Sequence, residues 1–354
     1  MLKSDSIPRL VLSDFRVYGP KQVVRVGEEK WTFVDLWTYA RWASIRLLEL
    51  GFEAGGLVVV ADVRPMLGIA LSFGGLCAGG VAFVGKWQDA LKNLEQFPCV
   101  AVFHGFGKGE LVRDKMGLSG QYRKKLLFIE EPVEPPPPPR RGLESLKDEE
   151  PIEKVMSRVG PDSDAILTLT NSEQTSLLTE KQVLGLAREV VETLGLGEND
   201  RIVAVTPPEG SFGLLRALLP AMIAQSLVVF AKGTNEFDIL LKSTLPTAVI
   251  LGKEESDACL EVLTRYLEQR ISGWDKTVLE RLNGKGFLST LARFAYEKGL
   301  SSLNKRKGEL RFVALENKAC VNNKAQRLLE VLGIRFGFLP SIMFTNSDTA
   351  VLVQ

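Results

Sequence analysis

Short apolar runs alternate with amphipathic segments along most of this chain. An apolar run bounded by glycine, proline or charged residues is typical of a buried parallel strand, and apolar residues at every third or fourth position are typical of a helix. Thr32, with Asp35 three residues later, matches a capping box and predicts where the first helix begins. In the first part of the chain, the pattern predicts strands at 57–61, 81–84, 99–103 and 126–129, and helices at 32–50, from 66 onward and at 88–96.

The same alternation returns in the second part of the chain. The predicted strands are at 165–169, 201–205, 227–231, 248–251, 310–314, 334–338 and 350–353, and the predicted helices are at 179–194, 211–224, 236–242, 254–271, 286–303 and 323–332. Strands that alternate with helices form mainly parallel sheets covered on both faces. We therefore expect an α/β fold with two doubly wound, mainly parallel sheets.

A proline-rich, charged segment separates the two parts. Five consecutive prolines at 135–139 favour a stiff polyproline II conformation that cannot pair into a sheet. Recognition by a proline-binding domain is the alternative, but a linker is the favoured interpretation. The predicted division is a first α/β lobe at 1–133, a linker at 134–154, and a second α/β lobe at 155–354 with inserted helices at 254–307.

Composition narrows the classes of partner and site. Lysine and arginine number 44 against 43 acidic residues, so the net charge of +1 offers no global field for nucleic acid or an anionic bilayer. The four cysteines form no C-x-x-C pair, which argues against a zinc knuckle or a disulfide framework and favours a reducing, cytoplasmic location. His104 is the only histidine, so no metal site is predicted.

Two segments have properties that suit a membrane. The stretch 65–85 carries no charge, but its many glycines indicate a helix packed tightly on a sheet, followed by a buried strand, rather than a transmembrane span. The basic amphipathic segment 286–307 could lie on a membrane surface. Docking against its own sheet is favoured for this segment, because the strands need helices to cover them.

A hydroxyl-rich stretch follows the predicted strand at 165–169, where a nucleotide-phosphate loop would lie. No glycine occurs between Asp164 and Gly185, so no residue there lets the backbone approach a phosphate closely. A second loop, 104–109, could form a small anion-binding nest, but an exposed loop is favoured because no helix start is predicted after it. Glu209, Glu236 and Asp238 are interpreted as solvated loop charges.

Several short motifs resemble one protein family. They are Thr32-Phe33, Leu50-Gly51-Phe52, Gly55-Gly56-Leu57-Val58 and Ala78-Gly79-Gly80-Val81-Ala82. With the order of elements, they resemble the N-terminal domain of AMP-forming acyl-adenylate synthetases, the superfamily of acyl-CoA synthetases and adenylation domains. This resemblance covers nearly the whole chain and implies two sheets packed together through helices. The helices at 254–307 resemble the long-chain fatty acyl-CoA synthetase branch.

The resemblance places the family's phosphate loop on a segment that has lost its chemistry. The loop would fall on Thr170, Asn171, Ser172, Glu173, Gln174 and Thr175, with the family's lysine missing. Glu173 would set a carboxylate against the ATP phosphates, and two like charges about 4 Å apart repel by about 1 kcal/mol even in water. We therefore expect the position of a phosphate cradle without its function.

The other motifs implied by the resemblance have also changed. Gly210 stands where the family often carries histidine, and Phe212 and Gly213 continue that motif. The adenine-contacting turn would fall on 316–319 without its glycines. The last motif would fall on 339–344, including Ser341, Met343 and Phe344, and methionine and phenylalanine cannot ligate magnesium.

These losses predict a catalytically degenerate acyl-CoA synthetase-like protein. It is expected to bind an acyl or other small ligand, or a partner synthetase subunit, near 170–175, 210–213 and 339–343, with no cofactor and no catalytic residue. Family members continue into a C-terminal lid domain, which is expected to be absent here. The alternative is a subunit of a split AMP-forming ligase that uses ATP and Mg²⁺ and is completed by a separate C-terminal domain. A third interpretation is a remnant that only folds.

Overall fold

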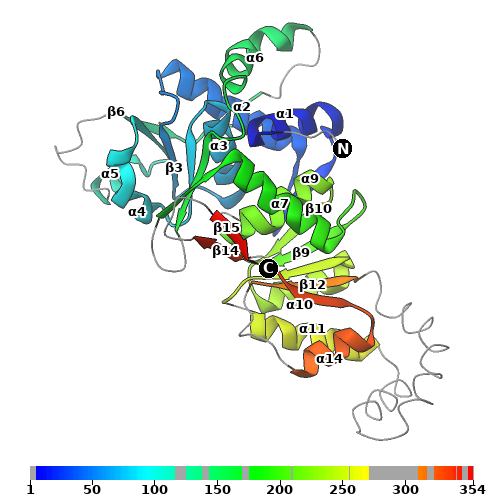
Figure 1. Cartoon of the computed structure of the whole chain (residues 1–354). Helices are drawn as coiled ribbons and strands as arrows, with labels where there is room; N and C mark the ends of the chain where they lie inside the picture. Colours follow the sequence, from blue (N-terminus) through cyan, green and yellow to red (C-terminus); the bar gives the residue numbers. More distant parts are fainter. Residues whose placement is uncertain are drawn as a thin grey trace, which may run out of the picture.

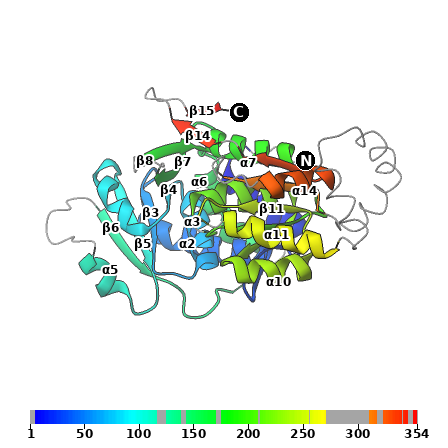
Figure 2. The ribbon, with the colours of Figure 1, turned by 90° about the horizontal axis from the view of Figure 1, so that it is seen from below.

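The computed structural model describes residues 5–115, 125–137, 143–169, 175–208, 210–254, 256–270, 310–316, 323–339, 341–344 and 350–353. The fold is α/β, with two mostly parallel sheets packed together through helices, as the sequence predicts. In Figure 1 the strands of the first sheet lie in the upper part of the molecule and those of the second sheet lie below them. Figure 2 shows α2 and α3 between β3 and β5 on one side and β11 on the other.

The first sheet has six strands in the order β6-β5-β3-β4-β7-β8. All neighbours run parallel except β8, which runs antiparallel to β7. The predicted strands lie within about a residue of those observed, but β8 was not predicted. The strands are β3 (Leu57–Ala61), β4 (Val81–Val84), β5 (Cys99–His104), β6 (Lys125–Glu130), β7 (Asp164–Leu169) and β8 (Thr175–Thr179).

The second sheet has seven strands in the order β13-β12-β11-β9-β10-β1-β2, parallel except for the hairpin of β1 and β2. A separate antiparallel pair is formed by β14 (Ser341–Phe344) and β15 (Ala350–Val353). The hairpin and β14 were not predicted. The strands of the second sheet are β1 (Gln22–Val26), β2 (Glu29–Thr32), β9 (Arg201–Val205), β10 (Leu227–Ala231), β11 (Ala248–Leu251), β12 (Phe312–Leu315) and β13 (Arg335–Phe338).

Membership of the sheets crosses the division expected at 134–154. The early strand β1 pairs with β10 and therefore belongs to the second sheet, whereas the later strand β7 pairs with β4 in the first sheet. Residues 143–154, expected to be linker, lie within α6 (Leu143–Met156). The prolines at 135–137 have neither helix nor strand structure, and 138–142 lie outside the described residues.

A layer of helices between the sheets contributes most of the main hydrophobic core. The core also includes side chains from both sheets, such as Val58 and Phe230. The tightest helix contact is at Gly74, where an added Cβ would lie 2.5 Å from the Ala40 carbonyl oxygen. The segment 65–85 is therefore a buried helix and strand, as expected. The helices of this layer are α1 (Ile7–Tyr18), α2 (Phe33–Glu49), α3 (Pro65–Cys77), α7 (Glu180–Leu194) and α9 (Leu219–Ala224).

Further helices cover the outer faces. The outer face of the first sheet forms one apolar cluster with Trp87, Leu94 and Val112, and the outer face of the second sheet forms another with α10 and α11. Among the described residues, no helix is long and apolar enough to cross a membrane. The outer helices are α4 (Trp87–Ala90) with a 3₁₀ turn (Leu91–Gln96), α5 (Gly109–Lys115), α10 (Thr234–Thr244), α11 (Ser256–Arg270) and α14 (Asn323–Val331).

Side-chain caps begin two of the central helices. The Asp35 backbone N–H donates to Thr32 Oγ1, and Asp35 Oδ2 accepts from the Thr32 backbone N–H at 2.7 Å, which confirms the predicted capping box. Thr179 and Gln182 form the same arrangement at the start of α7. The helix predicted at 211–224 is interrupted, because α8 (Ser211–Gly213) runs into a π-helical turn at Leu214–Leu218 before α9.

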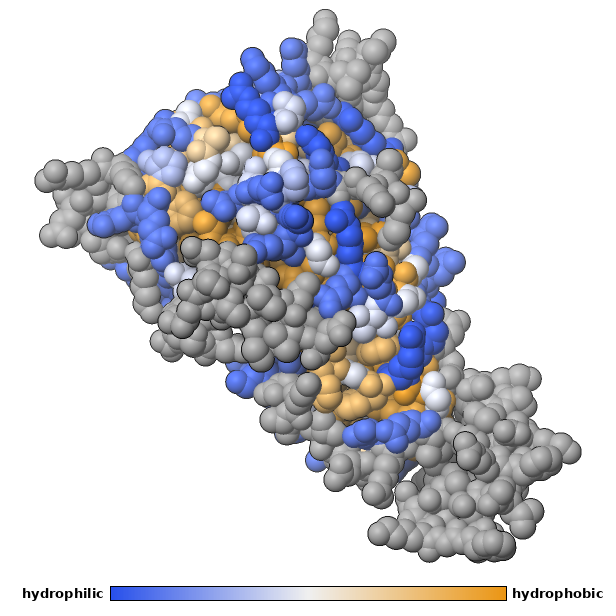
Figure 3. Space-filling view, viewed as in Figure 1, coloured by the Kyte–Doolittle hydropathy of each residue, from blue (hydrophilic) through white to orange (hydrophobic). Residues whose placement is uncertain are grey.

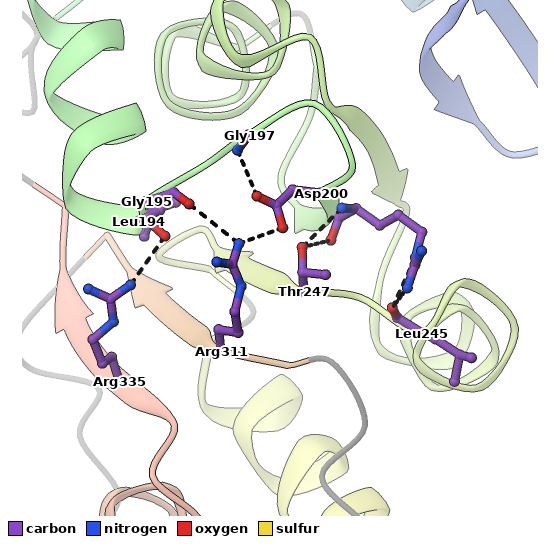
Figure 4. Close-up of polar contacts among 9 residues, drawn as sticks. Leu194, Gly195, Gly197, Asp200, Leu245, Thr247, Arg311 and Arg335 are labelled. Carbon is purple, nitrogen blue, oxygen red and sulfur yellow. Dashed lines mark hydrogen bonds and ion pairs between the residues drawn. The ribbon is translucent and has the colours of Figure 1, made fainter. Parts of the chain in front are cut away.

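Three arginines close the amino-terminal edge of the second sheet (Figure 4). Arg335 donates to the Leu194 carbonyl and Arg311 to the Gly195 carbonyl, both at the end of α7, and Arg201 donates to the Leu245 carbonyl after α10. Guanidinium groups at helix C-termini satisfy free carbonyls and oppose the negative end of the helix dipole. With Asp200 bound to Arg311, this edge is a structural clamp, and the opposite edge is left for the site.

Candidate functional site

A cavity of about 610 Å³ opens at the carboxyl-terminal edge of the second sheet. It is lined by residues at or just after the ends of β1, β9, β10, β11 and β12, together with Pro65 at the start of α3. The carboxyl ends of parallel strands are the usual ligand-binding edge of an α/β sheet, and the volume is within the range of small-molecule sites. The cavity is therefore the candidate ligand site.

Its inner walls are mainly apolar. Phe230 and Ala231 come from β10, Val205 from β9 and Val26 from β1, and all four side chains are buried. Pro207 and Pro208 continue the wall beyond the end of β9. A ligand that enters this space would replace water against apolar surface, which favours a molecule with an apolar body.

Charged residues stand at the ends of three strands around the cavity. Lys232 follows β10, Lys253 and Glu254 follow β11, and Glu316 follows β12. The side chains of Lys232, Lys253 and Glu254 are exposed, whereas Glu316 is half-buried. The rim therefore offers both signs of charge to the polar end of a ligand.

Two backbone amides at this rim are already occupied by side-chain carboxylates. The Lys232 N–H donates to Glu236 Oε2, and the Lys253 N–H donates to Glu316 Oε2, each at 2.8 Å. Such strand-end amides are the groups that would otherwise bind a phosphate or carboxylate. Glu236, expected to be a solvated charge, thus caps a strand end, whereas Asp238 forms an exposed ion pair with Lys242. Glu209 lies outside the described residues.

The predicted site residues at 210–213 support the cavity from outside it. Gly213 packs directly under the segment that lines the wall, since an added Cβ would lie 2.1 Å from the Pro207 carbonyl oxygen. The Gly210 N–H donates to the same oxygen at 3.1 Å. Phe212 is partly buried against the main core. None of the three lines the cavity, but Gly210 and Gly213 fix the path of Pro207 and Pro208.

Most of the predicted phosphate loop lies outside the described residues. Thr170, Asn171, Ser172, Glu173 and Gln174 cannot be placed, whereas Thr175 begins β8 and its Oγ1 donates to Asn93 Oδ1 at 3.0 Å. Ser341, Met343 and Phe344 belong to β14, where Met343 pairs with Val351 and Phe344 with Ala350. Their side chains are outside the description, so their place at a cleft floor stays a prediction.

Sequence reasoning missed the residues after β10 and β11. Lys232, Gly233, Gly252 and Lys253 belong to no motif, although each directly follows an apolar strand. The signal that could have found them is the strand-end rule itself, applied to every predicted strand rather than to the family motifs. Glu316, the first residue of the expected adenine turn, does line the cavity, and residues 317–319 are not described.

The loop at 104–109 differs from its predicted form. Its amides do form a nest, since the Phe106 N–H donates to Glu131 Oε1 at 3.0 Å and the Gly107 N–H to Glu130 Oε1 at 2.7 Å. The nest is therefore filled by the chain's own carboxylates. The expectation that no helix follows is wrong, because α5 begins at Gly109. His104 itself is buried, with Nδ1 3.1 Å from the Gly105 carbonyl oxygen.

Within the described ranges, no three His, Cys, Asp or Glu side chains are grouped so that they could hold a metal ion. The expectations about cofactors and metals stay predictions, because segments 170–174 and 345–349 are not covered. On the face seen in Figure 3, hydrophilic side chains surround the hydrophobic ones. The large exposed hydrophobic residues are spread over several elements, for example Val17, Phe106 and Ile239.

Comparison with known proteins identifies the fold. No protein-family model and no curated protein matches the sequence. Among solved structures, VinN in complex with L-aspartate is similar at 13% identity and a TM-score of 0.60, over 94% of this chain and 76% of that one. MbtA from Mycobacterium smegmatis is similar at 15% identity and 0.60, over 93% and 55%, and the anthranilate CoA ligase AuaEII in complex with anthranoyl-AMP at 13% and 0.60, over 94% and 58%.

The chain thus spans less than two thirds of the length of MbtA and AuaEII. At these identities, the likeness shows the fold and not the activity. The two sheets packed through helices match the N-terminal domains of adenylate-forming enzymes.

Proposed function

We propose that this chain is a catalytically degenerate acyl-CoA synthetase-like protein that binds a small ligand with an apolar body, of the acyl type, without activating it. The single observation that carries the proposal is the cavity of about 610 Å³ at the carboxyl ends of the second sheet. A cavity with apolar inner walls and a charged rim suits a molecule that has an apolar body and one polar end.

The proposed loss of catalysis rests on residue types and on the rim. The phosphate-loop positions 170–175 contain neither glycine nor lysine, and Met343 and Phe344 stand at the positions of magnesium-binding residues in the family pattern. At the rim, Glu236 and Glu316 already occupy the amides of Lys232 and Lys253. A triphosphate brought to this edge would meet carboxylates where it needs donors, and like charges repel.

The direct test is a thermal-shift series with saturated fatty acids of increasing chain length. At a ligand concentration about 100 times the dissociation constant, binding to the folded state adds about 2.7 kcal/mol of stability. We expect the melting temperature to rise with chain length and then level off when the cavity is full. No shift at any length would contradict an acyl ligand.

A cavity variant and a matched control locate the binding. Thr206 is half-buried and lines the cavity, so Thr206→Phe should fill space that the ligand needs and reduce the shift. Thr244 is also half-buried but ends α10 and does not line the cavity, so Thr244→Phe should keep the shift. Equal effects of the two variants would place the ligand elsewhere.

A second candidate function follows from the length of the similar structures. MbtA and AuaEII extend well beyond the part that this chain matches. The chain could therefore be one subunit of a split AMP-forming acyl-CoA ligase, completed by a separate C-terminal domain. This candidate requires Mg-ATP binding and pyrophosphate exchange in the presence of the partner, whereas the leading proposal requires neither.

A further inference from the structure

A buried arginine lies behind the cavity wall. Arg216 is 3% exposed and belongs to the π-helical turn Leu214–Leu218. The turn has a local cause, because Pro220 has no N–H, and in a regular α-helix its ring would clash with the Arg216 carbonyl. π-helical turns are frequent at functional sites. A guanidinium buried this deeply needs carboxylates nearby to remain charged.

Two carboxylates fill this need from different elements. Glu189 lies on α7, which packs against the π-helical turn, and Glu316 lies at the end of β12. Burial lowers the pKa of Arg216 to about 10, and the charges of Glu189 and Glu316 oppose this effect. The arginine is therefore a cation at neutral pH. Glu189 Oε2 is buried and accepts no hydrogen bond within the described ranges, so a neighbouring cation is what stabilises it.

Glu316 joins this buried charge to the cavity. Its Oε2 accepts from the Lys253 N–H at 2.8 Å, and its own N–H donates to the Leu251 carbonyl at 3.1 Å. These two bonds tie the end of β12 to the residues that follow β11. Gly252, Lys253 and Glu316 all line the cavity, but Arg216 does not.

We infer that Arg216 is a positioning residue that acts through Glu316 to hold the 252–254 wall in the arrangement that binds the ligand. The part of this inference that concerns the ligand rests on the proposed function. A purely structural role, as a counter-ion for Glu189 alone, would leave the Glu316–Lys253 bond unchanged. The two roles therefore differ in what happens at the Lys253 amide.

The test compares the hydrogen exchange of two backbone amides in one protein. The Lys253 N–H is bound by Glu316 and the Lys232 N–H by Glu236, with the same 2.8 Å distance, so Lys232 is an internal control. Two variants remove the buried cation: Arg216→Gln, and the double variant Glu189→Met with Arg216→Met, which leaves no unpaired charge in the core. Arg216→Lys keeps the charge and serves as the conservative variant.

We expect exchange at Lys253 to become about ten- to a hundredfold faster relative to Lys232, the range for losing a hydrogen bond to a charged group. Arg216→Lys should restore most of the protection. Equal changes at both amides, or no change at Lys253 in a variant that folds, would overturn the inference. If the double variant does not fold, Arg216→Gln decides the question in the same way.

A titration with dodecanoate separates this inference from the proposed function. If the wild type binds dodecanoate, the charge-removing variants should bind it at least about tenfold more weakly, as expected when one charge-assisted contact no longer holds the wall, and Arg216→Lys should bind it nearly as well as the wild type. If the wild type does not bind it, the proposal of an acyl ligand fails, while the exchange at Lys253 still decides the role of Arg216. Equal affinity in all variants would contradict the positioning role.

Discussion

Two buried carboxyl groups link the stability of this protein to pH. Asp14 on α1 is 5% exposed and Glu180 at the start of α7 is 1% exposed. Burial raises the pKa of Asp14 from 3.8 to about 7. Burial also raises the pKa of Glu180 from 4.5 to about 7, although the Ile7 N–H, which donates to its Oε2 at 2.7 Å, opposes the change. Both groups thus hold their protons more tightly in the folded state.

The sign of the pH dependence follows from these directions. Between pH of about 4 and 7 the folded state binds more protons than the unfolded state, so the free energy of unfolding should fall as pH rises. The contribution is complete below pH of about 4 and lost above about 7, and amounts to roughly 2 to 4 kcal/mol for each group. Urea unfolding from pH 5 to 8 measures it, with Asp14→Asn and Glu180→Gln expected to flatten the slope. A slope that both variants keep would contradict this assignment.

At the scale of elements, local patterns predict what depends on local residues. The strands β3, β4 and β5 are uninterrupted apolar runs, because both faces of the sheet are covered, and such runs can be recognised from sequence. The hairpin of β1 and β2 has charged residues within short strands, which hides it among loops. The partner of β1 could not be predicted at all, since β10 lies about two hundred residues further along the chain.

The junction between β9 and α8 makes a sharp prediction for one glycine. At Gly213 an added Cβ would lie 2.1 Å from the Pro207 carbonyl oxygen and 2.9 Å from its carbonyl carbon. Gly213→Ala must therefore push the backbone of the cavity wall, at a cost of roughly 1 to 3 kcal/mol typical of overpacking. Chemical denaturation measures the cost, and the variant should also lose part of any ligand-induced shift.

The matched control is another helical glycine with room around it. No atom lies within 4 Å of a Cβ added at Gly185 on α7. Gly185→Ala should therefore stabilise the protein by roughly 0.4 to 1 kcal/mol through the unfolded state. If the two alanine variants were equally stable, the close approach of Pro207 to α8 would not be a real constraint.

For the whole molecule, sequence predicted which edge of the sheets carries the site, but not which residues form it. The edge follows from the parallel strands, since their carboxyl ends must come together. Lys232 and Lys253 could not be chosen, because nothing local distinguishes a lysine after β10 or β11 from a solvated one. Pro65 joins the site only because α3 of the first sheet packs beside the second sheet.

One predicted outcome tests how far the nucleotide site is lost. Replacing Asn171–Thr175 with the glycine- and lysine-containing family loop should not create acyl-adenylate formation. Met343 and Phe344 would still stand at the positions of the magnesium-binding residues, and neither side chain can ligate the ion. Pyrophosphate exchange is the assay, and exchange above background would show that the assignment of the last motif to 339–344 is wrong.

The central claim is that a ligand cavity persists in an adenylate-forming fold whose nucleotide contacts are gone. Calorimetric titration of the protein with Mg-ATP up to millimolar concentration tests this most directly. The account predicts no binding heat above dilution, because the phosphate-loop positions have no glycine or lysine and the rim amides are held by Glu236 and Glu316. A saturable isotherm with a dissociation constant in the micromolar range would contradict it and favour the split-ligase alternative.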